Sequence, residues 1–196
     1  MRKVERSELL PLGEYEVVRA RFRNRVIALK RARRVQLGQH LSLVFENHDT
    51  VLLQIQEMLR AERITDNDAI AHELETYNEL IPEPGALSAT LFVEYEDRVE
   101  RRRKARQLSD LEQHLFLIFG AQRVRARFRR QPGEEPGRTP AVNYVTFEVS
   151  EAAQRELNNP GALVAIEVIH PHYTSRMVIS AATRQQLLAD LGNHAN

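Results

Sequence analysis

The spacing of apolar residues changes along the chain, from the period of a helix before about residue 80 to the alternation of strands after it. In the first part, Val18, Phe22, Val26 and Leu29 follow at helical spacing and predict one packing face of a helix. In the second, Leu87, Ala89 and Leu91 occupy every second position. Helices therefore crowd the first half and strands the second, which predicts an α+β fold rather than a βαβ series.

The same patterns place the individual elements. We predict helices at 14–34, 50–64, 66–80, 96–111, 150–157 and 180–191. We predict strands at 41–46, 87–95, 115–119, 123–129, 143–149, 162–169 and 176–179, forming a mixed or antiparallel sheet against which amphipathic helices pack. A chain of 196 residues can bury one continuous core, so we expect a single α+β domain over 1–196. Three Pro and two Gly predict a flexible loop at about 131–140.

The composition excludes several kinds of chemistry. The chain has no Cys, which removes thiolate nucleophiles, disulfides and thiolate metal sites, so any metal ion must be held by His, Asp, Glu or carbonyl oxygen. The sequence contains no apolar run of about 18 residues, as a membrane span would need. We therefore expect a soluble cytoplasmic protein without a membrane partner.

Charge is strongly segregated, although the formal net charge is only +1. Residues 1–34, 35–97, 98–138 and 139–196 carry net charges of +7, −11, +7 and −2. Such blocks either pair within the folded protein or attract a charged partner, and pairing between copies makes a homodimer possible. Of the 28 basic residues 25 are Arg, a side chain suited to phosphate and carboxylate, although a GC-rich genome gives the same bias.

One basic surface is predicted within the strand at 123–129. Val124, Ala126 and Phe128 alternate with arginines, so a half-buried strand would present an arginine comb to solvent. The comb consists of Arg123, Arg125, Arg127 and Arg129. It is able to follow a phosphate backbone, but no nucleic-acid-binding motif accompanies it. A solvated face, or a contact with the chain's own acidic block, is the alternative.

No catalytic motif is present: the chain lacks a glycine-rich phosphate loop, a G-x-S-x-G elbow and an H-E-x-x-H helix. His170 and His172 flank a proline and place two imidazoles on one side of an extended segment. A carboxylate joining them would complete a metal site. Alternatively, His170 ends a strand and hydrogen-bonds the backbone.

A second polar group surrounds the helix at 50–64. The apolar stripe of this helix continues to Glu62, and a carboxylate in line with core residues must be paired, hydrated or bound. Glu57 is able to pair with Arg60, three residues later, while Glu46 and Gln54 add further polar groups. Together they form a candidate metal or ligand site. Helix capping and surface ion pairs are the alternative.

With these segments defined, the chain resembles a bacterial family catalogued as domain of unknown function 3501. The motifs that carry the resemblance lie at 2–4, 9–11, 45–50 (FENHDT), 54–63 (QIQEMLRAER), 77–82 (YNELIP), 89–91 with Glu94, and 170–173 (HPHY). They span nearly the whole chain. The family pattern has Arg in place of His48 and a variable residue in place of His172, which weakens a metal site built on these two histidines.

The resemblance also implies a cellular setting. By this resemblance, the protein is expected to be encoded, like members of the family, beside iron–sulfur oxidoreductases of the heterodisulfide-reductase type and beside rubrerythrin-like proteins. This implies an accessory role in cytoplasmic redox or peroxide defence, with such a protein as partner. A metal-dependent enzyme using Glu and His, and a nucleic-acid-binding protein, are the alternatives. The ligand or metal candidates are Glu46, Asn47, Gln54, Glu57, Glu62, Tyr77, Asn78 and His170.

Overall fold

The structure is a computed structural model that describes residues 1–130 and 133–192. Its α-helices are α1 (Leu12–Arg31), α2 (His48–Ala61), α3 (Asn67–Asn78), α4 (Arg98–Gln107), α5 (Glu151–Asn158) and α6 (Ala181–Gly192). Its strands are β1 (Arg34–Leu37), β2 (Leu41–Phe45), β3 (Ala86–Val93), β4 (Leu115–Phe119), β5 (Gln122–Arg125), β6 (Arg127–Arg129), β7 (Val142–Glu148), β8 (Val164–His170) and β9 (Tyr173–Val178). The predicted α+β class is confirmed.

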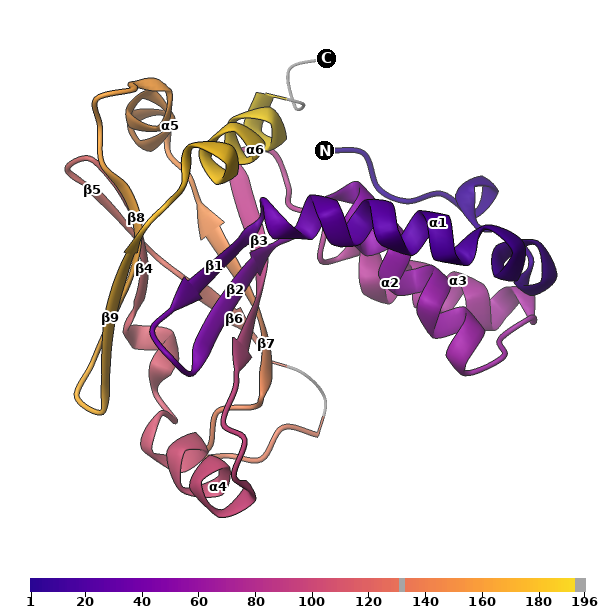
Figure 1. The fold of residues 1–196 in the computed structure, drawn as a ribbon, viewed down its shortest axis with the longest axis horizontal. Helices are drawn as coiled ribbons and strands as arrows, with labels where there is room; N and C mark the ends of the chain where they lie inside the picture. Colours follow the sequence, from indigo (N-terminus) through magenta and orange to yellow (C-terminus); the bar gives the residue numbers. More distant parts are fainter. Residues whose placement is uncertain (131–132, 193–196) are drawn as a thin grey trace.

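The strands form two antiparallel sheets rather than one, in the orders β1-β2-β3-β7-β6 and β5-β4-β8-β9. The two sheets meet at both edges. The chain passes from β5 directly to β6 at the buried Ala126, and β1 at the far edge contacts β9. The result is a barrel-like body whose main core lies between the sheets, with α4 at one end and α5 and α6 at the other (Figure 1).

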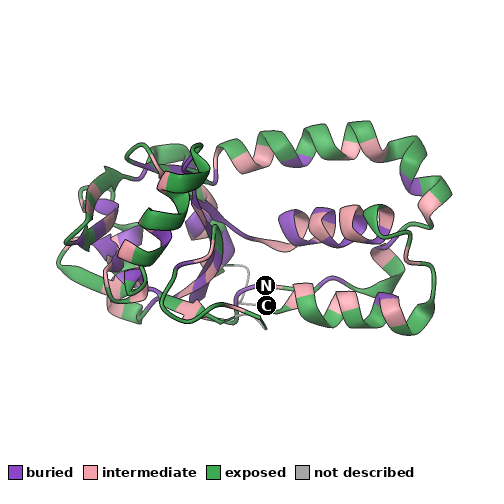
Figure 2. Ribbon diagram, turned by 90° about the horizontal axis from the view of Figure 1, so that it is seen from below, coloured by how far each residue is buried: buried purple, intermediate pink, exposed green. Residues whose placement is uncertain are grey.

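Helices α1, α2 and α3 project from this body as an arm (Figure 1). A second, smaller core holds the arm together and includes Val51, Ile55 and Leu59 of α2. Helix α1 is mostly exposed, as Figure 2 shows, and within it only Tyr15 and Val26 are buried. The predicted packing face is wrong at Val18, which is 40% exposed. Tyr15 and Arg19 contact α2 in its place.

Most predicted helices and strands are present with shifted ends, but strand β1 was missed and one predicted strand is divided in two. Strand β1 follows α1 after a two-residue turn, where the prediction extended the helix to residue 34. The strand predicted at 123–129 is two strands, because the chain changes sheets at Ala126. The loop predicted at 131–140 lies partly outside the described residues, and its described part, 133–140, contains no helix or strand. No helix in the described ranges has the length and apolar character that crossing a membrane requires.

Candidate functional site

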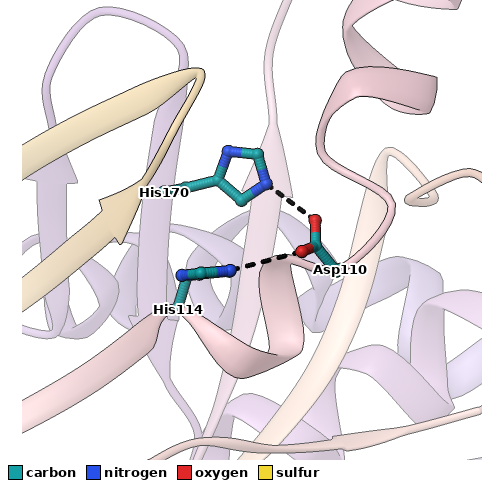
Figure 3. Close-up of side chains that lie close together, drawn as sticks. All are labelled: Asp110, His114 and His170. Carbon is teal, nitrogen blue, oxygen red and sulfur yellow. Dashed lines mark hydrogen bonds and ion pairs between the residues drawn. The ribbon is translucent and has the colours of Figure 1, made fainter.

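Three side chains of types that are able to bind a metal ion meet where the four-stranded sheet ends nearest α4. Asp110 precedes the 3-10 turn η2 (Leu111–Gln113), and His114 follows this turn and leads into β4. His170 is the last residue of β8, which pairs with β4 in antiparallel register. This pairing brings His114 beside His170, and the turn folds Asp110 between them (Figure 3). Among the residues the structure describes, this is the one group of three or more such side chains close enough to hold a metal ion.

The Asp110 carboxylate divides its two oxygens between the two imidazoles. His170 Nε2 lies 2.8 Å from Oδ1, and His114 Nε2 lies 3.3 Å from Oδ2 (Figure 3). The His170 side chain is buried, whereas about half of the Asp110 side chain and a quarter of that of His114 are exposed. The site is therefore open to solvent on the side of His114 and Asp110.

Backbone contacts set the tautomer of each ring in its neutral form. The backbone N–H of His172 donates to His170 Nδ1 at 3.0 Å, so the ring proton of a neutral His170 sits on Nε2 and is donated to Asp110. His114 Nδ1 lies 2.6 Å from the carbonyl oxygen of Ile169, so Nδ1 carries a proton and donates it there. In neutral His114 the Nε2 lone pair then faces the Asp110 carboxylate.

The electrostatics agree with a charged carboxylate at this position. The hydrogen bond from His170, aided by the one involving His114, holds the pKa of Asp110 below its ordinary value. Asp110 is thus ionised at neutral pH. When His114 is neutral, a carboxylate oxygen and an imidazole lone pair face one another; a proton on His114 Nε2 turns the contact into a hydrogen bond, and a metal ion would bridge the two atoms.

Glu46, Asn47 and Gln54, three of the residues predicted as ligands, do lie together at the base of the arm. Buried Glu46 accepts hydrogen bonds from the hydroxyls of Thr50 and Thr90 and, at 3.1 Å, from the Gln54 amide. Asn47 is the N-cap of α2, since its side chain accepts from the Thr50 N–H at 3.0 Å. These contacts attach α2 to β2 and β3. Glu46, Asn47 and Gln54 thus serve helix capping and packing, the alternative to a ligand site.

The other predicted ligands on α2 point elsewhere. Glu57 does not pair with Arg60 as predicted; it accepts from Arg19 and from the Tyr15 hydroxyl across the α1–α2 interface, at 2.6–2.8 Å. Arg60 instead reaches Glu16 of α1. Glu62 is not in line with the core, because α2 ends at Ala61 and Glu62 caps it in solvent.

Tyr77 and Asn78 belong to the arm, and neither reaches the Asp110 group. The Asn78 side chain pairs with the backbone N–H and carbonyl of Val4 at 2.8 and 2.9 Å and so holds the N-terminal segment on α3. Tyr77 packs on the second core and lines a small hollow of about 190 Å³ with Tyr144. Burial raises the pKa of both phenols.

The arginine comb is divided between the two sheets. Arg123 stacks on Phe116 and lies 3.6 Å from Glu167, while Arg127 pairs with Glu148. Arg129 pairs with Glu79, a residue of the acidic block. Three of the four arginines thus meet the protein's own carboxylates. Val124, Ala126 and Phe128 contribute to the main core as predicted.

Comparison with known proteins places the chain in a family and finds a similar solved structure. A family model described as "Protein of unknown function (DUF3501)" matches residues 3–191. The chain is a member of the DUF3501 family. It is also similar to a crystal structure of a novel protein of unknown function from Burkholderia pseudomallei K96243, at 36% identity over 97% of this chain and 100% of that chain, with a TM-score of 0.89. The curated proteins gave no match.

In this DUF3501 protein, the HPHY motif at 170–173 has three structural tasks. His170 contacts Asp110, and the backbone of His172 orients the His170 ring. Tyr173 donates to the Leu37 carbonyl and accepts from the backbone N–H of His40 at 3.2 Å, which joins β9 to the β1–β2 turn.

Sequence reasoning singled out His170 but missed Asp110 and His114. The signal was present in two places. Asp110 and His114 are four residues apart just before the strand predicted at 115–119. Antiparallel pairing of that strand with the one predicted at 162–169 places His114 next to His170.

Proposed function

We propose that this protein binds a divalent transition-metal ion between His114 Nε2 and Asp110 Oδ2, and that His170 positions the carboxylate. The observation that carries the proposal is the pair of facing acceptors, 3.3 Å apart, with His114 Nδ1 already committed to the Ile169 carbonyl. A proton or a metal ion would relieve this contact, and the distance and the neighbouring hydrogen bonds are those of a metal site.

The distance between the two acceptors suits a metal ion. Zinc binds imidazole nitrogen and carboxylate oxygen at about 2.0–2.2 Å, so the edge of a tetrahedron around it measures about 3.4 Å. The 3.3 Å separation of the two atoms is close to that edge. Imidazole and carboxylate together suit zinc, iron, cobalt, nickel and manganese.

The second layer of contacts also matches a metal site. Ligating histidines commonly donate their other N–H to a carbonyl or carboxylate, and ligating carboxylates are themselves hydrogen-bonded. The Ile169 carbonyl serves His114, and the His170 N–H serves Asp110. His170 is itself not a ligand, because the His172 N–H holds the ring with its proton on Nε2. Two protein ligands leave the remaining coordination positions open to water, a substrate or a partner.

The experiment is equilibrium dialysis of tag-free protein against Zn²⁺ or Mn²⁺, with bound metal measured by mass spectrometry. We expect about one equivalent of metal in the parent protein and little in H114A. H172A is the matched control, because it removes a neighbouring imidazole but keeps the backbone N–H that orients His170. Absence of bound metal from the parent, or equal binding by H114A, would contradict the proposal.

A second candidate function is docking of an acidic protein, and helix α4 favours it. This helix carries six basic residues against one acidic residue, is largely exposed, and ends three residues before Asp110. A partner bound on α4 would therefore lie beside the proposed metal ion. The family resemblance suggests an iron–sulfur oxidoreductase or a rubrerythrin-like protein of the cytoplasm as this partner.

This docking is tested by affinity purification from the native organism, with and without nuclease. We expect R102Q/R103Q to lose a redox partner that the parent protein retains after nuclease treatment. Loss of all bound material on nuclease treatment would instead support nucleic-acid binding through the arginines.

A further inference from the structure

The arm carries a cleft that the metal site does not use, between α1, α2 and the segment before α1. Its volume is about 530 Å³, within the range of small-molecule sites, which is about 300–1,000 Å³. The walls are mainly apolar or aromatic and include Leu10, Tyr15, Val18, Phe22 and Leu52. Leu10 and Val18 remain 37% and 40% exposed, so the cleft is open along one side.

Internal hydrogen bonds hold the cleft in shape without using its open side. Buried Gln56 pairs with both the backbone N–H and the carbonyl of Leu10, at 3.0 Å each. Tyr15 donates to Glu57, and its ring meets that of Phe22 edge-on, with 6.4 Å between centroids. The polar groups of Tyr15 and Gln56 are thus already satisfied, and a ligand meets largely apolar walls.

The charges left over around the cleft are positive. Glu8 is already paired with Arg2 at 2.7–2.8 Å and with His48 at 3.0 Å. Arg25 has a long contact with Asp49, at 3.7 Å, and Arg21 has no ion-pair partner within the described ranges. Arg21 and Arg25 are one helical turn apart and so reach the same side of α1.

We infer that this cleft binds a small amphipathic carboxylate, with its apolar body on Val18, Phe22 and Leu52 and its carboxylate on Arg21 and Arg25. An apolar wall beside two guanidinium groups complements such a molecule in shape and in charge. Val18 and Phe22 form one row along α1, and Arg21 and Arg25 form the next. The site is independent of the proposed metal ion, which lies on the sheets.

The test uses octanoate as the probe and 1-octanol as its uncharged match, with binding followed by amide chemical shifts of the full-length protein. We expect octanoate to shift signals of α1 and α2 and to bind at least about tenfold more tightly than octanol, as expected of charge-assisted hydrogen bonds. R21Q/R25Q should remove this difference. R31Q, at the end of α1 and outside the lining, should preserve it.

A second pair of variants tests the apolar wall. V18W should fill the cleft and abolish binding of octanoate, whereas V17W, at a neighbouring position that is 85% exposed and outside the lining, should leave it unchanged. Equal binding of octanoate and octanol, equal effects of V18W and V17W, or no binding at millimolar octanoate would overturn the inference. Binding of an acidic amphipathic peptide but not octanoate would overturn it in favour of a protein-docking groove.

Discussion

At the scale of single residues, one oxygen of the Asp110 carboxylate contacts each of two histidines whose neutral rings carry the proton on different nitrogens. His170 donates its Nε2 proton to Oδ1, while neutral His114 presents a lone pair towards Oδ2. The backbone sets this difference, through the His172 N–H on one ring and the Ile169 carbonyl on the other. We therefore expect His114 and His170 to have different roles in metal binding, and substitution of each residue should distinguish these roles.

The first prediction concerns metal affinity. H114A removes a ligand and should abolish specific binding, whereas H170A removes the orienting hydrogen bond and should weaken binding by about 10–100-fold. H172A should bind metal like the parent. Isothermal titration of Zn²⁺ into each variant measures the three affinities. If H170A and H114A lose binding equally, His170 is a third ligand.

The second prediction concerns Gly38, which has a φ of +68° in the β1–β2 turn. A Cβ atom there would lie 2.5 Å from the hydroxyl oxygen of Tyr173, so G38A adds a steric clash to backbone strain. The strain alone should lower the free energy of unfolding by about 1–3 kcal/mol. Urea unfolding of G38A, Y173F and the double variant measures the coupling. We expect G38A to destabilise Y173F less than the parent, and equal effects would contradict the clash.

At the scale of elements, ion pairs supplement the limited apolar packing of α1 against α2. Glu57 of α2 receives Arg19 and the Tyr15 hydroxyl from α1, and the hydrogen bond from Arg19 is the largest contribution lowering the pKa of Glu57 to about 2. Burial, followed by the hydrogen bond to Glu57, raises the pKa of the Tyr15 phenol. Helix α2 is thus held to α1 by a carboxylate that must stay ionised.

The third prediction is that acid weakens this interface. Because the folded state lowers the pKa of Glu57, its stabilisation is complete above the unfolded value of about 4.5 and is lost as the pH falls towards 2. E57Q should therefore lose less stability than the parent over that range. Chemical unfolding at a series of pH values measures both curves. Parallel curves would contradict the assignment.

How well each feature could be predicted from the sequence depended on how local its signal is. Alternation correctly placed Leu87, Ala89, Leu91 and Val93 in the core, because the period of a strand is visible within a few residues. The change of sheet at Ala126 does not interrupt this alternation, because Val124 before it and Phe128 after it both pack against the main core. The Asp110 group joins residues 60 apart, so it depends on strand pairing that no local pattern specifies.

At the scale of the whole molecule, a buried ion pair joins the base of the arm to helix α6. Arg33, between α1 and β1, makes two hydrogen bonds of 2.6 and 2.7 Å to Asp190 of α6, and both side chains are at most 4% exposed. The pair thus links the base of the arm to the helix that closes the sheets. A bidentate pair of this kind specifies one relative position of the two elements.

The fourth prediction follows from the burial of this pair. D190A should lower the free energy of unfolding by about 3–5 kcal/mol, because it leaves the Arg33 guanidinium buried without its carboxylate. R33M/D190L, which replaces both charges with apolar groups, should recover much of that loss. Thermal and urea unfolding measure both variants. If the double variant is as unstable as D190A, the uncompensated charge does not explain the loss.

The central claim is that a metal ion binds between Asp110 and His114. Locating a bound metal ion in a crystal tests this claim most directly. Crystals soaked in Zn²⁺ and measured at the zinc absorption edge should show an anomalous peak about 2.0–2.2 Å from both His114 Nε2 and Asp110 Oδ2. His170 Nε2 should remain bonded to Oδ1 and outside the coordination sphere. A peak bonded to His170, or no peak at Asp110 in fully soaked crystals, would contradict the account.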